Sequence, residues 1–204
     1  MLEAAAYAAD DHFTVEIERT ATPADRLGGS RRFRVITSLA GRPFETFTLD
    51  IGDHEPIGTA DSVTLPGVLD FAEIAAVTVP AIPLAQQIAE KLHAYTRRYE
   101  RGRASTRVKD LIDLVLIAEL FVLDAAELSR AVEEIFTARA THMKPIAVPY
   151  PPTEWVLPFR NLADTVSVTG DLTEGHAIAA GLLDPILQGR IGTGIWRPER
   201  KAWS

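Results

Sequence analysis

Residues Ile82–Glu119, IPLAQQIAEKLHAYTRRYERGRASTRVKDLIDLVLIAE, contain the pattern that decides the fold of this chain. At about 100° per residue, apolar side chains recur on one face of a first helix and over a wide arc of a second. A basic segment with one glycine, residues 97–103, joins the two patterns. The stretch therefore predicts two helices joined by a basic loop, the second of them well buried.

Lys91 lies inside the apolar arc of the first helix, between Ile88 and Tyr95. A lysine that is buried without a partner is costly, so this position needs an explanation. The lysine stem can cover apolar surface while the ammonium group reaches water, and the spacing alone favours this interpretation. The alternative is a cation that faces a cleft and meets an anion such as a phosphate.

The second helix carries two charge pairs at helical spacing. Lys109 and Asp113 are four residues apart, and Arg107 and Asp110 are three apart. Such pairs are usually exposed and contribute a few tenths of a kcal/mol each. Asp113, however, shares its side of the helix with leucines, which indicates that it is only partly exposed.

The composition of the chain limits the classes of protein to which it can belong. The chain has 204 residues, 47% hydrophobic and 24% charged, which is typical of a globular protein with one domain, or with a core domain and a helical appendage. Its net charge of -7 argues against a general nucleic-acid partner, so any such contact needs a local basic patch, for which the loop at Arg97 and Arg98 is suited. The absence of cysteine excludes disulfides and thiolate chemistry and fits a cytoplasmic location. We expect no membrane span, because no apolar run approaches about 18 residues.

Periodicity and turn residues outline the remaining elements. Alternating apolar residues predict antiparallel strands at 13–18, 32–38, 44–51 and 75–82. Capping and helical patterns predict three further helices, at 124–139, 155–166 and 173–183. We therefore expect an α+β fold with a small mixed or antiparallel sheet flanked by helices, and a C-terminal helical region. The expected division is a core at 1–120, a helical region at 121–187 and an irregular tail at 188–204, anchored by Trp196 and Trp203.

Other candidate sites are weaker. Asp50 ends the third strand on the face opposite the apolar one, where a carboxylate can be a metal ligand or a base, although a solvated polar residue is the commoner case. The five histidines show no metal-binding spacing, and no G-x-S-x-G turn accompanies them. Gly28-Gly29 precedes a strand and lacks the residues of a phosphate-binding loop.

Two segments of the quoted stretch carry a resemblance to a known family: Pro83–Ala94, PLAQQIAEKLHA, and Ser105–Leu114, STRVKDLIDL. Together with the strands RRFRV at 31–35 and ETFTLDI at 45–51, they resemble the nucleotidyltransferase toxins of the AbiEii/AbiGii type, which include mycobacterial members that modify tRNA. The resemblance covers most of residues 10–140. It implies a polymerase-β-like nucleotidyltransferase fold.

The resemblance also implies roles for individual residues. Lys91 would contact the triphosphate of a bound nucleotide, Asp113 would hold or orient part of the active site, and Asp50 would be a third carboxylate and a metal ligand near the attacking hydroxyl. Nucleotide or RNA contacts would come from four basic residues, Arg97, Arg98, Arg107 and Lys109. The implied cofactor is Mg²⁺, and the implied partners are a nucleoside triphosphate, an RNA such as tRNA, and a cognate antitoxin.

One departure from the family pattern leaves two functions open. The family's first motif is a glycine turn followed by a D-x-D-like carboxylate pair, and no D-x-D or D-x-E precedes the first strand of this sequence. We therefore expect the chain to begin after that motif, and two-metal catalysis to fail without it. The first hypothesis is an Mg²⁺-dependent enzyme that transfers a nucleotide to an RNA end in its full-length form. The second is a catalytically incomplete protein that binds an antitoxin or another partner. An exposed sheet edge or apolar face also suggests self-association.

Overall fold

The structure is a computed structural model, and it describes residues 12–20, 30–52, 60–65, 76–97 and 107–204. The chain divides into two compact units, Met1–Glu55 and Pro56–Ser204, which we describe separately. The first contains an antiparallel sheet, and the second contains a hairpin, five described α-helices and a small C-terminal sheet. The expected α+β class is confirmed.

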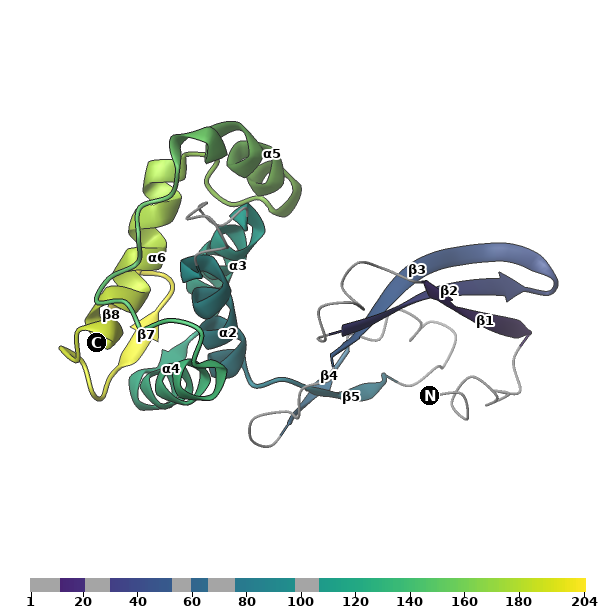
Figure 1. Cartoon of the computed structure of the whole chain (residues 1–204), viewed down its shortest axis with the longest axis horizontal. Helices are drawn as coiled ribbons and strands as arrows, with labels where there is room; N and C mark the ends of the chain where they lie inside the picture. The colour runs from purple at the N-terminus through teal and green to yellow at the C-terminus, as the bar shows by residue number, and fades with distance from the viewer. Residues whose placement is uncertain (1–11, 21–29, 53–59, 66–75, 98–106) are drawn as a thin grey trace. The chain divides into compact units, whose positions relative to one another are not determined.

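The sheet of the first unit has three strands, β1 (Phe13–Thr20), β2 (Ser30–Leu39) and β3 (Arg42–Gly52), in the order β1-β2-β3 with antiparallel neighbours (Figure 1). All three strands were predicted. The β2–β3 turn is tighter than expected, because Leu39 pairs with Arg42. Only Ala40 and Gly41 lie between them, with φ angles of 48° and 75°. Left-handed conformations at both positions are those of a two-residue hairpin turn, which explains why the strand begins at Arg42.

The register of this sheet separates an apolar face from a polar one. Val35 lies opposite both Ile17 and Phe47, whereas Arg32 lies opposite Asp50. Side chains alternate between faces along a strand, so Phe47 and Asp50 point to opposite sides, as the sequence predicted. Among the described residues of this unit, Val35 is the buried apolar residue, and its apolar neighbours on the sheet remain partly or largely exposed.

The second unit begins with a hairpin of β4 (Asp61–Thr64) and β5 (Thr78–Ala81). Its helices are α2 (Leu84–Thr96), α3 (Val108–Leu120), α4 (Ala125–Arg139), α5 (Val156–Val166) and α6 (Leu172–Leu187), with a short 3-10 turn, η4 (Thr153–Trp155), before α5. Each helix expected from the sequence is present. The α4 start is also as predicted, because the Asp124 carboxylate accepts hydrogen bonds from the backbone N–H groups of Ala126 and Glu127.

One hydrophobic core joins these helices. Ile88 and Leu92 of α2, Leu111 of α3, Leu128 of α4 and Leu182 of α6 are fully buried within it. The core runs across residues 120 and 187, where the sequence had suggested boundaries. Within the described part of the chain, every helix is too short or too polar to cross a lipid bilayer.

Helix α6 is longer than predicted. Its expected end near Asp184-Pro185 is wrong, because the helix contains Pro185 and continues to Leu187. Proline removes one backbone donor, yet Ile186 and Leu187 are both buried, and their burial favours another turn of helix. The Asp184 carboxylate is also in use, since it accepts a hydrogen bond from the backbone N–H of Val148 at 2.8 Å.

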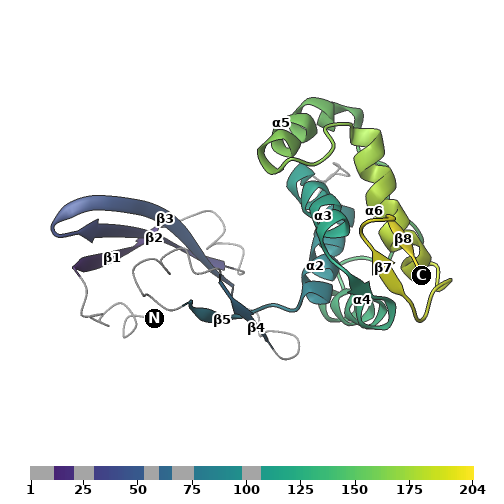
Figure 2. The same cartoon turned by 180° about the vertical axis from the view of Figure 1, so that it is seen from behind.

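The C-terminal tail is ordered by its tryptophans. Residues 188–204 were expected to be irregular, but they contain β7 (Ile195–Arg197) and β8 (Ala202–Trp203), and β7 also pairs with β6 (Leu123–Asp124). The hairpin lies beside α6 (Figures 1 and 2). Trp196 is fully buried and donates its Nε1–H to the Ala118 carbonyl at 2.8 Å, while Trp203 donates to Leu182 at 3.0 Å. The predicted anchoring role of both tryptophans is confirmed.

Candidate functional site

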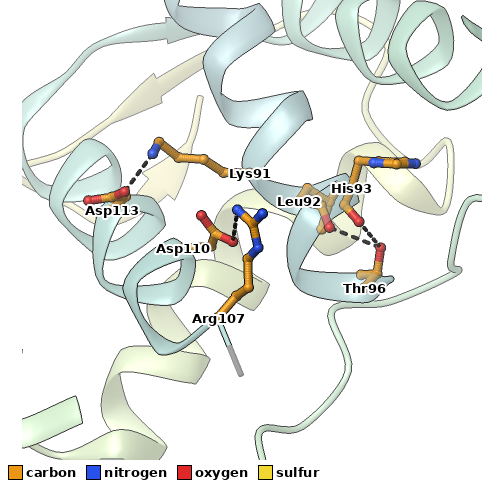
Figure 3. A network of polar contacts seen from close by, with 7 residues as sticks. All are labelled: Lys91, Leu92, His93, Thr96, Arg107, Asp110 and Asp113. Carbon is orange, nitrogen blue, oxygen red and sulfur yellow. Dashed lines mark hydrogen bonds and ion pairs between the residues drawn. The ribbon is translucent and has the colours of Figure 1, made fainter. Parts of the chain in front are cut away.

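The lysine in the apolar arc of α2 has a carboxylate partner. Lys91 Nζ lies 2.5 Å from Oδ2 of Asp113 on α3, and the two side chains are 27% and 22% exposed. Figure 3 shows the lysine reaching from α2 toward the aspartate on the neighbouring helix. The pair is therefore half-buried, with one edge open to solvent. The sequence spacing had made Lys109 a candidate partner of Asp113. The structure instead places Lys91 in contact with Asp113, whereas Lys109, four residues away, is exposed.

A second pair lies on the N-terminal side of the first. Arg107 Nη1 contacts Asp110 Oδ2 at 3.5 Å, as the three-residue spacing predicted. Arg107 is 51% exposed, whereas the Asp110 side chain is only 11% exposed. Burial raises the pKa of the Asp110 carboxyl, the positive charges of Arg107 and Lys91 lower it, and the negative charge of Asp113 raises it. All four side chains thus belong to one polar cluster between α2 and α3.

Helix periodicity builds this cluster from a short sequence. Asp110 and Asp113 are three residues apart on α3, so their carboxylates lie about one turn apart on one side of the helix. Lys91 comes from α2, which packs beside α3, and both helices contribute side chains to the same core, among them Leu92 and Leu111. Asp110 was not among the expected site residues. The signal that could have identified it is an aspartate in the first turn of the helix, directly before the apolar pair Leu111 and Ile112.

The opposite side of α2 holds a separate polar group (Figure 3). His93 is buried, and its Nε2 lies 2.9 Å from the Thr141 hydroxyl. The His142 ring lies 4.6 Å from the His93 ring, centroid to centroid, and 2.8 Å separates its Nε2 from the Thr96 hydroxyl. Burial, with a smaller contribution from the His142 charge, lowers the pKa of His93 to about 4. These contacts tie α2 to the segment after α4, and they point away from Lys91.

The remaining predicted cations of unit 2 lie near the same helices. Arg97 is an exposed residue that follows α2, and its backbone N–H bonds to the His93 carbonyl. Arg98 and the rest of the basic loop lie outside the described residues. Arg107 and Lys109 are exposed at the start of α3. The structure thus brings Lys91, Asp113 and Arg107 into one cluster, with Lys109 on the neighbouring surface.

Asp50 belongs to the other unit and has its own partner. Arg32 on β2 donates two hydrogen bonds to its carboxylate, from Nε at 2.7 Å and from Nη2 at 2.8 Å. These hydrogen bonds lower the pKa of Asp50, and the positive charge of Arg32 lowers it further while desolvation opposes both. Both side chains are about half exposed. The cross-strand register places the two residues opposite each other, so this bidentate pair is a consequence of strand pairing.

The carboxylates of the described residues are dispersed rather than clustered. Nowhere among them do three or more histidine, aspartate or glutamate side chains gather closely enough to hold a metal ion. Both oxygens of Asp50 accept hydrogen bonds from Arg32, and Asp113 is paired with Lys91.

The second unit also contains a pocket of about 350 Å³. Its lining residues do not include the Lys91 cluster, and no sequence pattern predicted it. It is formed by the N-terminal ends of α2 and α4 with the residues around β6. Its charged lining residues are four acids and one base, namely Asp61, Asp124, Glu127, Glu134 and Arg130. Such a lining repels phosphate groups, so the pocket does not suit a nucleotide.

The chain matches a known protein family over most of its length. Residues 1–179 match the family model described as nucleotidyl transferase AbiEii toxin, type IV TA system. No curated protein matches the chain. The family match covers α2 and α3 with the Lys91–Asp113 pair, and it ends before the β7–β8 hairpin. The chain belongs to the AbiEii family of nucleotidyltransferase toxins from type IV toxin–antitoxin systems.

Proposed function

We propose that the Lys91 cluster binds the phosphates of a nucleoside triphosphate, and that the protein transfers the nucleotide to an RNA end, with tRNA as the substrate. The observation that carries this proposal is the half-buried Lys91–Asp113 pair. One hydrogen bond to Asp113 uses one of the three ammonium protons, so the lysine keeps donors for a phosphate oxygen. Asp113 orients the ammonium group, and Arg107 and Lys109 extend the positive surface.

The proposed reaction is a substitution at phosphorus. An RNA hydroxyl oxygen bonds to the α-phosphorus, the bond from that phosphorus to the bridging oxygen breaks, and pyrophosphate leaves with its electron pair. The hydroxyl proton passes to solvent water. Lys91 offsets negative charge on the triphosphate throughout, a role that a positioned cation performs without proton transfer.

The test is a comparison of nucleotide binding and transfer in matched variants. Each of ATP, GTP, CTP and UTP is added with Mg²⁺ or with EDTA, and the Tm is measured. We expect one nucleotide to raise the Tm, and Lys91→Ala to remove the rise. Lys144→Ala is the control, because Lys144 pairs with Glu133 and its side chain is 29% exposed, close to the 27% of Lys91. A Tm that no nucleotide changes would refute the proposal for this chain. The EDTA arm tests the proposed dependence on Mg²⁺.

The second candidate function is a protein that binds a partner without catalysis. It is favoured by the lack of a metal-ligand cluster among the described residues. Under this proposal the chain co-purifies with the cognate antitoxin and transfers no labelled nucleotide to total tRNA. Transfer by the isolated chain would contradict it.

The largely exposed apolar face of the β1–β2–β3 sheet also leads us to propose self-association, which sedimentation equilibrium measures.

A further inference from the structure

Asp110 is the buried charge that the proposed function leaves unexplained. It is 8% exposed, and His93 is the other polar residue buried to this degree among the described residues. Its neighbours along α3 are apolar and buried, including Leu111 and Leu114. A buried carboxylate is costly unless charges or hydrogen bonds compensate it, and an apolar residue of similar size would pack at this position without that cost.

Two features of the fold compensate the Asp110 charge. The residue lies in the first turn of α3, where the helix dipole favours a negative charge. It also lies next to two cations, Arg107 on its own element and Lys91 on α2, with Asp113 one turn further along (Figure 3). Charges therefore alternate through the cluster, and each carboxylate of α3 contacts one cation.

The two cations differ in how firmly they are held. Lys91 is half-buried and lies 2.5 Å from its carboxylate, whereas Arg107 is half-exposed and lies 3.5 Å from Asp110. Arg107 precedes α3 and directly follows residues outside the described part of the chain. Asp110 contacts this guanidinium group from the first turn of α3.

We propose that Asp110 is a positioning residue that holds the Arg107 guanidinium next to Lys91, so that the two cations bind one chain of phosphates together. The inference rests on the proposed function, because it concerns the same nucleotide. Arginine suits this role since its planar donors match two phosphate oxygens at once, but only when the group is held in a fixed orientation. Buried Asp110 provides that orientation, while the exposed part of Arg107 faces the ligand.

The experiment measures the affinity of the full chain for inorganic tripolyphosphate and for each nucleoside triphosphate by titration calorimetry at constant ionic strength. The variants are Asp110→Asn, Arg107→Ala and the double variant. Removal of a negative charge near a polyanion should by itself tighten binding. The proposal predicts the opposite, a loss of about tenfold in Asp110→Asn, which corresponds to about 1.4 kcal/mol. The double variant should bind no more weakly than Arg107→Ala, because both changes remove the same contact.

Asp171→Asn is the matched control, because Asp171 caps the N-terminus of α6 and its amide variant removes the same charge outside the cluster. Equal or tighter binding by Asp110→Asn overturns this inference and leaves the proposed function standing. Lack of any binding by the wild-type chain refutes both. If Asp110→Asn does not fold, Arg107→Ala decides: an affinity within about twofold of wild type would show that Arg107 holds no phosphate, and would overturn the inference.

Discussion

Lys91 and Asp113 are 22 positions apart in the chain, yet their Nζ and Oδ2 atoms lie 2.5 Å apart. The pair joins α2 to α3 across the segment 98–106, which lies outside the described residues. Because both side chains are half-buried, each charge compensates the other, which would be unfavourable at this position without a partner. The same contact therefore bears on stability as well as on the proposed binding of phosphate.

Removal of one partner should leave the other charge half-buried and unpaired. We expect Asp113→Ala to lower the free energy of unfolding by about 1–2 kcal/mol, less than for a fully buried pair because water still reaches the edge of this one. Urea titration followed by circular dichroism measures the change. Glu134→Ala is the control, since its pair with Arg130 spans 3.5 Å between exposed side chains and should cost less than about 0.5 kcal/mol. Equal losses in the two variants would contradict the prediction.

Stability should fall in acid because of His93. Its pKa is about 4 in the folded protein, and about 6.5 in an unfolded chain. The unfolded state therefore binds more protons between these values, and the stabilisation, fully present above about pH 6.5, is lost as the pH falls toward 4. His142, Arg139 and Arg97 lower the pKa in addition to burial, whereas Glu90 raises it.

We expect His93 to account for a loss of about 2 kcal/mol between pH 7 and pH 5. Urea titrations across this range measure it in the wild type and in His93→Gln, whose amide can still reach Thr141. The variant should show a flatter dependence on pH. If the free energy of unfolding of His93→Gln depended on pH as steeply as that of the wild type, groups other than His93 would cause the acid sensitivity.

Gly175 allows α6 to approach α5. A Cβ atom at this position would lie 2.4 Å from Cζ of Phe159, which is fully buried. Gly175→Ala should therefore destabilise the protein by about 1–3 kcal/mol through overpacking, although alanine favours helix. Thermal unfolding measures the effect, and Phe159→Leu in the same chain should recover part of the loss. Gly192→Ala is the control, because a Cβ there meets no atom within 4 Å. A Gly175→Ala variant as stable as wild type would show that the ring moves freely.

Trp196 makes a hydrogen bond that phenylalanine cannot. In Trp196→Phe the Ala118 carbonyl would lose the Nε1–H donor at 2.8 Å, and a small cavity would remain. We expect a loss of about 2–3 kcal/mol from the unpaired buried carbonyl and the cavity together. Trp203→Phe removes the bond to Leu182 at a partly exposed position, so its cost should be smaller. Chemical unfolding of both variants gives the comparison, and the reverse order would contradict the prediction.

The helices and strands could be predicted from the sequence because the formation of each depends mainly on residues that are close together in the chain. The alternation in residues 44–51 indicated β3, and the Asp124 cap marked the start of α4. The partners of charged residues could not be found in the same way. Spacing suggested Lys109 for Asp113, but the structure supplies Lys91 from another helix. Arg32 became the partner of Asp50 only through the strand register.

Three further differences from the expected structure have the same origin. Proline patterns ended α6 too early, because the burial of Ile186 and Leu187 is a tertiary effect that outweighs the local preference. The tail looked irregular since its strands are two and three residues long, too short to show alternation. Asp110 was overlooked as a site residue because burial of a carboxylate depends on how α2 and α3 pack.

The β7–β8 hairpin has a consequence for how the protein is made. Trp196 contacts Ala118 across 78 positions of sequence, and Ile195 and Ser204 pair at the very end of the chain. Ribosomes add residues from the N-terminus, so α3, which carries Asp113, is synthesised long before the strands that cover it. The helical core therefore acquires the buried Trp196 only after all five described helices have been synthesised. Packing of α3 against its full set of core neighbours waits for a residue that is added 78 positions after Ala118.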